Sequence, residues 1–445
     1  SGSFNATASG EFSTVSGGKV NTASGGCSTV SGGYGNTASS DYSTVAGGEG
    51  NTASGPYSTI AGGTGNTASS DYSTVAGGRN STASGDYSTI AGGGYNTAIG
   101  YNSTIAGGNQ NTASGSYSTV SGGKINNATG ACSTIGGGCC NIASTYDSTV
   151  GGGAKNTASG LNSVVGGGFT NIASGSYTTI AGGSQNQTTG SFATVGGGCT
   201  NTASGNCSTV AGGCGNIASS DYSTIAGGYT SNASGTYSTV SGGHTNIASC
   251  SYSTVAGGRT NTASGGNSTV GGGGQNTAIG YNSTIGGGYC STASGSHSTV
   301  AGGMYNAASG TCSTIGGGCC NIASGSYSTI AGGYCSNASG TYSTVSGGHT
   351  NIASGSFSGI LGGCRNTVYN SGSFAIGLNI TSNADCTTFV NNLHVTGSTT
   401  TNAILQLSRR ATTPSPAVEG MIIASGSAGA STLYYYNGSI WNALA

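Results

Sequence analysis

The chain has 445 residues, of which 91 are glycine and only 4% are charged, and its formal net charge is −1. Hydrophobic residues make up 34%, so large apolar side chains are scarce and any core must be thin. A near-neutral chain without a basic cluster is a poor candidate for nucleic-acid binding. No apolar run approaches the roughly 20 residues of a membrane-spanning helix, which argues against membrane insertion.

One fifteen-residue unit, close to N-T-A-S-G-x-Y-S-T-V-A-G-G-x-x, recurs without insertion or deletion from Ala6 to Arg365. Counting Ala6 as column one gives 24 copies. Column ten is Val or Ile and columns twelve and thirteen are Gly in all 24, whereas columns fourteen and fifteen vary freely. This pattern is typical of stacked equivalent coils, with constant columns inside or at turns and variable columns in solvent.

Each copy predicts two strands of about four or five residues, over T-A-S and S-T-V-A, joined by glycine turns. Alternation points columns three, eight and ten inward and columns two, nine and eleven outward. Column ten is the predicted core ladder, represented by Val15, Val30, Val45, Val210 and Ile360. The paired glycines are predicted to turn the backbone with positive φ, as at Gly17, Gly18, Gly362 and Gly363. Asn in column one, present in 19 copies, is predicted to form a ladder at the coil corner.

These features predict an all-β fold, a parallel β-solenoid of 24 coils that is roughly 115 Å long at about 4.8 Å per coil. Each coil buries one Val or Ile and one or two Ala, which is little apolar area for fifteen ordered residues. We therefore expect packing between chains along the whole rod.

Column seven holds Tyr in eleven copies, but also Phe, Cys, Asn, His and Asp147. A dry core would not accept Asp, so this column is predicted to be at least partly exposed. A row of tyrosines can pack between chains or contact a ligand such as a glycan or a receptor, and a plain solvated surface is the third alternative. The column is represented by Tyr42, Tyr72, Tyr222 and Tyr327.

Thirteen of the 15 cysteines fall in columns seven, fourteen and fifteen, where many other residues also occur. The simplest interpretation is that they are small, tolerated surface or interface residues. The alternative is a disulfide between successive coils, for which Cys199 with Cys214 and Cys320 with Cys335 share a column. No C-x-x-C pair with partner spacing predicts a zinc site.

Catalytic chemistry is not predicted anywhere in the chain. The four histidines are far apart, and the nine acidic residues form no ladder of calcium ligands. The glycine-rich stretches lack the Lys-Ser/Thr pair that binds phosphate. We therefore expect no enzyme activity, no metal and no cofactor.

The segments NTAIGYNSTIAGG from Asn96 and NTAIGYNSTIGGG from Asn276 resemble the head repeats of trimeric autotransporter adhesins. Runs such as NTASGSYSTVSGG from Asn111 are similar to repeat-bearing tail-fibre-like proteins of phages, large viruses and some bacteria. The resemblance covers about residues 1–380. It implies trimers of parallel β-rolls, so the expected partner is a second and third copy of this chain.

The repeat loses its register after Arg365. We therefore divide the chain into a solenoid shaft (1–365), a transition with a degenerate repeat (366–392) and a C-terminal segment (393–445). In the last, VEGMIIAS and TLYYYNGSIWNAL, separated by a Gly/Ser turn, predict a β-hairpin. The segment resembles the terminal segments of viral and phage fibres. We predict that it caps the solenoid and helps chains to trimerise, because an open end exposes unpaired strand edges.

Together these features predict an extracellular fibre or adhesin shaft on a virion or cell surface, attached to a host receptor or glycan through multivalency. One alternative is an ice-binding solenoid, because column nine is Thr in all copies except two, Val164 and Gly359. Interruptions of the Thr row in column two, such as Ile142, Ile172 and Gln187, count against that alternative. Another is a bacterial surface filament whose rods join end to end.

Overall fold

The computed structural model of the chain describes residues 4–391, 409–410, 422–427, 430–436 and 439–444. Every regular element in these ranges is a β-strand and none is a helix. Odd-numbered strands run from β1 (Thr7–Ala8) to β47 (Ile352–Ala353), one in columns two and three of each copy. Even-numbered strands run from β2 (Thr14–Val15) to β46 (Thr344–Val345), one in columns nine and ten of every copy except the last.

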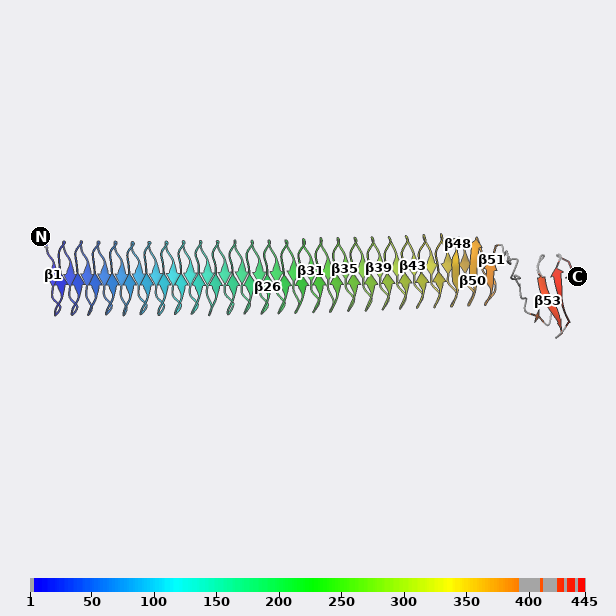
Figure 1. Ribbon diagram of the computed structural model, residues 1–445, viewed down its shortest axis with the longest axis horizontal. Coiled ribbons are helices and arrows are strands. Elements are labelled where there is room, and N and C mark those ends of the chain that lie inside the picture. The colour runs from blue at the N-terminus through cyan, green and yellow to red at the C-terminus, as the bar shows by residue number, and fades with distance from the viewer. Residues whose placement is uncertain (1–3, 392–408, 411–421, 428–429, 437–438, 445) are drawn as a thin grey trace, which may run out of the picture. The chain divides into compact units, whose positions relative to one another are not determined.

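Each strand pairs in parallel with the equivalent strand of the next copy, as in the register Thr22↔Thr37 and Ala23↔Ala38. The repeats therefore form a parallel β-solenoid of about 26 turns, which confirms the predicted fold (Figure 1). The strands are shorter than predicted, because only two residues of each are paired. A third line of contacts compensates at column fourteen, where isolated parallel bridges join residues such as Lys19 and Tyr34.

Hydrogen bonds tie each coil to both of its neighbours. Most backbone hydrogen bonds between coils are donated to the following coil, as the N–H of Thr22 donates to the carbonyl of Asn36 at 2.8 Å. Columns seven and fifteen donate to the preceding coil instead, as Cys27 does to the carbonyl of Glu11 at 2.7 Å. Cys27 has a φ of 55°, a left-handed conformation that costs a residue other than glycine roughly 1–2 kcal/mol. Because this geometry recurs at column seven in every copy, the backward bonds are a built-in feature of the coil.

The interior consists of two aliphatic columns and is as thin as the composition indicates. Ala in column three and Val or Ile in column ten are fully buried from the second copy onward, including Val30, Val45, Val210 and Ile360. Val15, in the first copy, is partly buried against this core. Ser of column eight is also inside, whereas Thr of columns two and nine is mostly half-buried on the outer faces.

Asn in column one is buried and forms a ladder along the corner of the coils. Its bonds run from side chain to backbone, not from amide to amide. Asn201 Nδ2 donates to the carbonyls of Gly197 and Gly213, both at 2.9 Å. Its Oδ1 accepts the backbone N–H of Asn216 at 3.0 Å. One side chain therefore satisfies backbone groups in the preceding coil, in its own coil and in the next.

The left-handed turn lies at the second glycine of each pair, where φ is 80–108°; the first glycine has a positive φ in five copies only, and there it is 152–159°. Gly18 and Gly363 have φ values of 84° and 90°, and a Cβ on Gly18 would lie 2.1 Å from the carbonyl oxygen of Gly33. Gly17 and Gly362 do not have positive φ, and a Cβ on either would meet nothing within 4 Å. The predicted turn geometry is therefore corrected: Gly17 and Gly362 face open space.

The solenoid continues beyond Arg365 with altered coils. β48 (Gly359–Cys364) is longer than the strands before it and pairs with β50 (Phe374–Leu378), with a register shift between Ile360 and Gly362. β49 (Thr367–Val368) extends the ladder of columns two and three. β51 (Thr388–Val390) follows, and the compact unit that contains the solenoid ends at Phe389.

A second compact unit spans Val390–Ala445. Its described strands form a four-stranded sheet in the order β52 (Arg409–Arg410), β53 (Ile422–Ser427), β54 (Ala430–Tyr436) and β55 (Trp441–Leu444). β53 and β54 pair antiparallel, which is the hairpin that the sequence predicts. Much of the predicted C-terminal segment, 393–408 and 411–421, lies outside the described residues. The described ranges contain no helix with the length and apolar character to cross a membrane.

Candidate interaction surface

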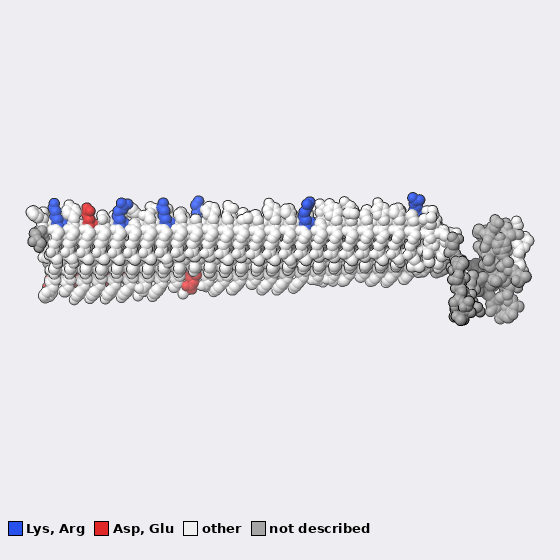
Figure 2. Space-filling view, turned by 45° about the horizontal axis from the view of Figure 1, so that its top comes forward, with Lys and Arg blue, Asp and Glu red and all other residues white. Residues whose placement is uncertain are grey.

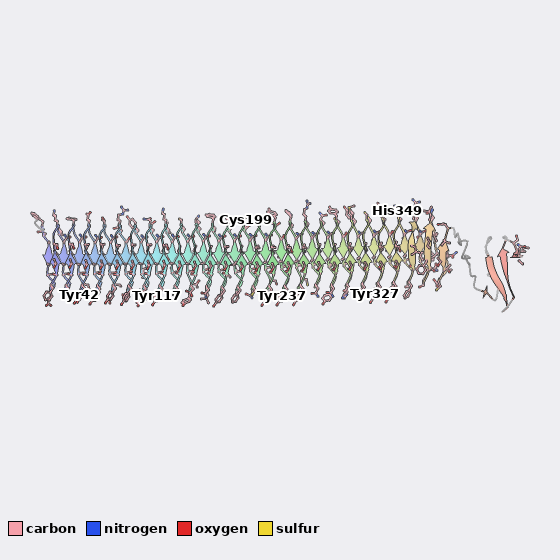
Figure 3. All side chains as sticks on the ribbon, in the orientation of Figure 1. Tyr42, Tyr117, Cys199, Tyr237, Tyr327 and His349 are labelled. Atoms are coloured by element: carbon pink, nitrogen blue, oxygen red, sulfur yellow. The ribbon has the colours of Figure 1, made fainter. Side chains whose placement is uncertain are left out.

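Two long edges of the solenoid carry its largest side chains. Figure 3 shows Tyr42, Tyr117, Tyr237 and Tyr327 at the tips of the coils along one edge, with Cys199 and His349 along the opposite edge. The first is formed by columns six and seven and is called here the tyrosine edge. The second is formed by columns fourteen and fifteen and is called the variable edge.

Aromatic rings of column seven stack along the tyrosine edge. Parallel rings in neighbouring coils have centroids 4.7–5.0 Å apart and interplanar angles of 2–8°. The side chains of Tyr42, Tyr72, Tyr222 and Tyr327 are 46–52% exposed. Because stacked rings cover each other's faces, the surface offers ring edges and hydroxyl groups to a partner.

Column six supplies the large side chain where column seven lacks one. Five copies have Asn or Asp in column seven, and four of these carry Tyr or Leu in column six, at Tyr101, Tyr146, Leu161 and Tyr281. No other copy has an aromatic residue or Leu in column six. Tyr101 fills the gap between Tyr87 and Tyr117 through edge-to-face contacts with centroids 5.6 and 5.5 Å apart.

This exchange between two columns keeps a large side chain at the coil tip along runs of coils. The relation is visible in the sequence only when columns six and seven of the same copy are compared with each other. The left-handed φ at column seven supplies a physical reason for the exchange. Asn and Asp adopt that conformation more easily than Tyr does, and the neighbouring position then carries the ring.

The hydroxyls of Tyr42 and Tyr87 on the tyrosine edge stay protonated near neutral pH, because the pKa of each is raised above its ordinary value. Partial loss of water contact raises the pKa of Tyr87, and the hydroxyls of Tyr72 and Tyr101 add to the increase. The neighbouring thiol of Cys27 raises the pKa of Tyr42, with Tyr57 as the next contributor. A phenolate in such a row would face other groups that are themselves able to become anions.

The variable edge brings several thiols together. Cys199 and Cys214 are bridge partners in successive coils, and a hydrogen bond with Cys214 raises the pKa of the Cys199 thiol. Cys320 Sγ lies 3.1 Å from Cys319 Sγ, and this contact raises the pKa of Cys320, whereas a hydrogen bond with Cys335 lowers it. All of these thiols are free in this structure. The disulfides between successive coils stay a prediction.

Extended surface is what the described coils offer to a partner. Among the described residues, no three His, Cys, Asp or Glu side chains could hold a metal ion, and no cavity opens in that part of the chain. The two sheet faces carry mostly small side chains: column eleven is Ser, Ala or Gly in every copy except at Leu361, whereas column two is Ile in six copies. Thr side chains of column nine lie in register along one face, as at Thr209 and Thr224.

A family model described as the ubiquitous surface protein adhesin repeat matches residues 343–355. The matched stretch runs from column eight of one copy to column five of the next, so it covers β46 and β47. No curated protein matches the chain. The match and the repetitive β-solenoid around it support an adhesin-like role at a surface.

Proposed function

We propose that this chain is a non-enzymatic, surface-exposed fibre that attaches to a host or another surface as an adhesin. The observation that carries the proposal is the uninterrupted repetition of one coil, which offers the same exposed columns to a surface at every step of the rod. The adhesin repeat match in residues 343–355 supports the same role. Weak contacts repeated on one rod reinforce each other, because binding at one coil raises the effective concentration of the next.

A parallel homotrimer is the proposed working assembly. The thin core of two aliphatic columns leaves each rod with large surfaces for contact with other chains. Residues 393–445 are proposed to promote trimer formation. Both a virion surface and a cell surface are compatible with this arrangement.

Binding of the purified full chain to cells and to immobilised glycans tests the proposed function. We expect attachment without turnover of any substrate, and a mass in solution of three times the chain's 42.1 kDa. Deletion of residues 393–445 should lower the trimer fraction. Attachment should fall more steeply than the number of chains when trimers are separated. A separated chain that binds as strongly as the assembly would contradict the role of multivalency, and absence of attachment to every surface would contradict the function.

Ice binding is a second candidate, favoured by the Thr row of column nine. Successive Thr residues pair in register on a parallel ladder, as Thr209 does with Thr224. The resulting row presents hydroxyl and methyl groups at a spacing of about 4.8 Å. Thermal hysteresis separates this candidate from attachment.

A further inference from the structure

Opposite charges are segregated to the two edges of the solenoid. All Lys and Arg residues of the repeats 6–365 lie on the variable edge and are exposed: Lys19, Arg79, Lys124, Lys155, Arg259 and Arg365. Figure 2 shows basic side chains in a line along one edge. Six of the seven acidic residues of the same repeats lie on the tyrosine edge and are also exposed: Glu11, Asp41, Asp71, Asp86, Asp147 and Asp221.

Local contacts hold several of these charges in place. Arg79 Nη2 donates to the Tyr95 hydroxyl at 2.9 Å, and its guanidinium lies 5.1 Å from the centre of that ring. Asp41 Oδ1 accepts the backbone N–H of Gly26 at 2.9 Å. Asp221 Oδ1 accepts the N–H of Asn206 in the same way, also at 2.9 Å. Such groups are partly ordered before a partner arrives, which lowers the entropy cost of using them in an interface.

In three coils an acidic and a basic residue also lie at the same position along the rod axis. The coils 6–20, 66–80 and 141–155 each carry an acid on the tyrosine edge and a base on the variable edge, eight residues later. The pairs are Glu11 with Lys19, Asp71 with Arg79, and Asp147 with Lys155. Every coil is one step of the same ladder, so two parallel rods without axial stagger place equivalent coils side by side. An acid of one rod then lies opposite a base of its neighbour at all three heights.

We propose that copies of this chain associate edge to edge, with the tyrosine edge of one rod against the variable edge of the next. The rods are parallel and unstaggered. The inference rests on the self-association proposed above and specifies the contact. The surfaces in contact differ, so every copy uses both edges, and in the proposed trimer these contacts close into a ring of three.

The ion pairs and the aromatic rings contribute differently to this contact. Exposed ion pairs contribute only about 0–1 kcal/mol each, so three of them set register and direction more than affinity. Half-exposed aromatic rings supply the apolar area, and both edges carry them, as at Tyr42 and Tyr34. Aromatic residues and Arg are enriched in protein interfaces for this reason.

One coil carries like charges on its two edges, so a substitution that corrects it should strengthen the assembly. Coil 36–50 has acids on both edges, Asp41 and Glu49. In the unstaggered arrangement these two carboxylates face each other across the contact. Glu49→Lys should therefore tighten the assembly, although a random surface substitution would have no reason to do so.

Charge reversal on the full chain tests the proposal. The triple variant Lys19→Glu, Arg79→Glu, Lys155→Glu makes both edges acidic, and we expect the concentration for half-assembly to rise roughly tenfold or more. Adding Glu11→Lys, Asp71→Lys and Asp147→Lys exchanges the charges of the three pairs between the two edges. This six-residue variant should assemble like the wild type. Arg259→Glu is the matched control, because its coil has Ser251 on the tyrosine edge and no acid.

Sedimentation at low salt measures the assembly, and circular dichroism checks that each variant is folded. The difference between wild type and triple variant should disappear near 1 M salt, where the screening length is about 3 Å. The proposal is overturned if the wild type is monomeric, if the triple variant assembles normally, or if the six-residue exchange fails to restore assembly. Surface attachment measured on the same samples keeps the proposed function separate, because a monomer that still attaches contradicts only the edge contact.

Discussion

The hydroxyl of Ser223 donates a hydrogen bond of 2.6 Å to the backbone carbonyl of Ser220, three residues earlier. Both are in a coil whose fifth column is Ser. Most coils have Gly in that column, and there the buried hydroxyl of column eight, such as that of Ser208, has no hydrogen-bond partner among the described residues. A buried hydroxyl without a partner is destabilising.

The two serines should therefore respond differently to the same substitution. We expect Ser223→Ala to lower the local stability of its coil by about 1 kcal/mol, because a hydrogen bond is lost. Ser208→Ala should be neutral or stabilising, and Ala193 already occupies the same column in a neighbouring copy, fully buried. Native-state hydrogen exchange in the flanking coils measures this, since a long repeat array lacks a single unfolding free energy. A larger loss at Ser208 than at Ser223 would contradict the assignment.

The column-one ladder predicts a graded series at Asn201. Removal of its side chain by Asn201→Ala leaves the buried N–H of Asn216 without its acceptor, so we expect a loss of about 1–3 kcal/mol in the adjoining coils. Asn201→Ser should be milder, because Ser81 in the same column accepts the N–H of Asn96 at 3.3 Å. Hydrogen exchange at Asn216 reports the difference directly, and equal protection in all three proteins would refute the role of the side chain.

The aliphatic ladder and the tyrosine edge should differ in their tolerance of charge. Val210→Asp places an unpaired charge among fully buried side chains, which costs several kcal/mol or protonates the new carboxyl. Tyr222→Asp should be far milder, because Tyr222 is 49% exposed and Asp147 already occupies that column. Thermal unfolding and proteolysis of both variants check this. Equal loss of melting temperature would contradict the orientation of the two columns.

Two adjacent glycines should respond in opposite ways to one added methyl group. A Cβ on Gly213, whose φ is 88°, would lie 2.1 Å from the carbonyl oxygen of Gly228, so Gly213→Ala should separate the coils locally. A Cβ on Gly212 would meet nothing within 4 Å, so Gly212→Ala should leave the isolated rod intact. If Gly212→Ala nevertheless lowers the assembled fraction, then another chain approaches that face closely. Circular dichroism and sedimentation together distinguish the two effects.

Thermal hysteresis of the purified rod discriminates between the two candidate functions. If the rod is an attachment fibre, we expect no gap between melting and freezing in dilute solution. An ice-binding rod would show such a gap, and replacement of Thr209 and Thr224 by bulky residues would abolish it. A clear gap in the wild type would overturn attachment as the first choice.

Much of the solenoid could be predicted, because the residue types that each column accepts show whether that column is buried or exposed. Val or Ile in column ten and Asp147 in column seven distinguish inside from outside without any structure. The strand lengths could not be predicted. Alternation of residue types shows which side chains point inward, but it does not show where the backbone pairing ends. The same applies to Gly17 and Gly18, which are equally constant in sequence although only Gly18 has a left-handed φ.

The surface was harder to predict than the interior. Asn102 looks like a gap in the tyrosine row until Tyr101 is considered with it, because the two positions share one coil tip. The Sγ atoms of Cys319 and Cys320, which are adjacent in the chain, are in contact. The shared column position of Cys320 and Cys335 predicts a different pair. Sequence columns show which coils are equivalent, but side-chain directions at a turn depend on φ values that the columns do not contain.

The uninterrupted pairing of residues fifteen apart has a consequence for how such a chain can change over time. Loss of any fifteen consecutive residues from the repeats removes one coil and rejoins equivalent neighbours, whereas loss of fourteen would misplace every later side chain. Near-identical units also favour misaligned recombination in the gene. We therefore expect the length of the solenoid to vary in whole steps of about 4.8 Å, with every remaining column still facing the same way.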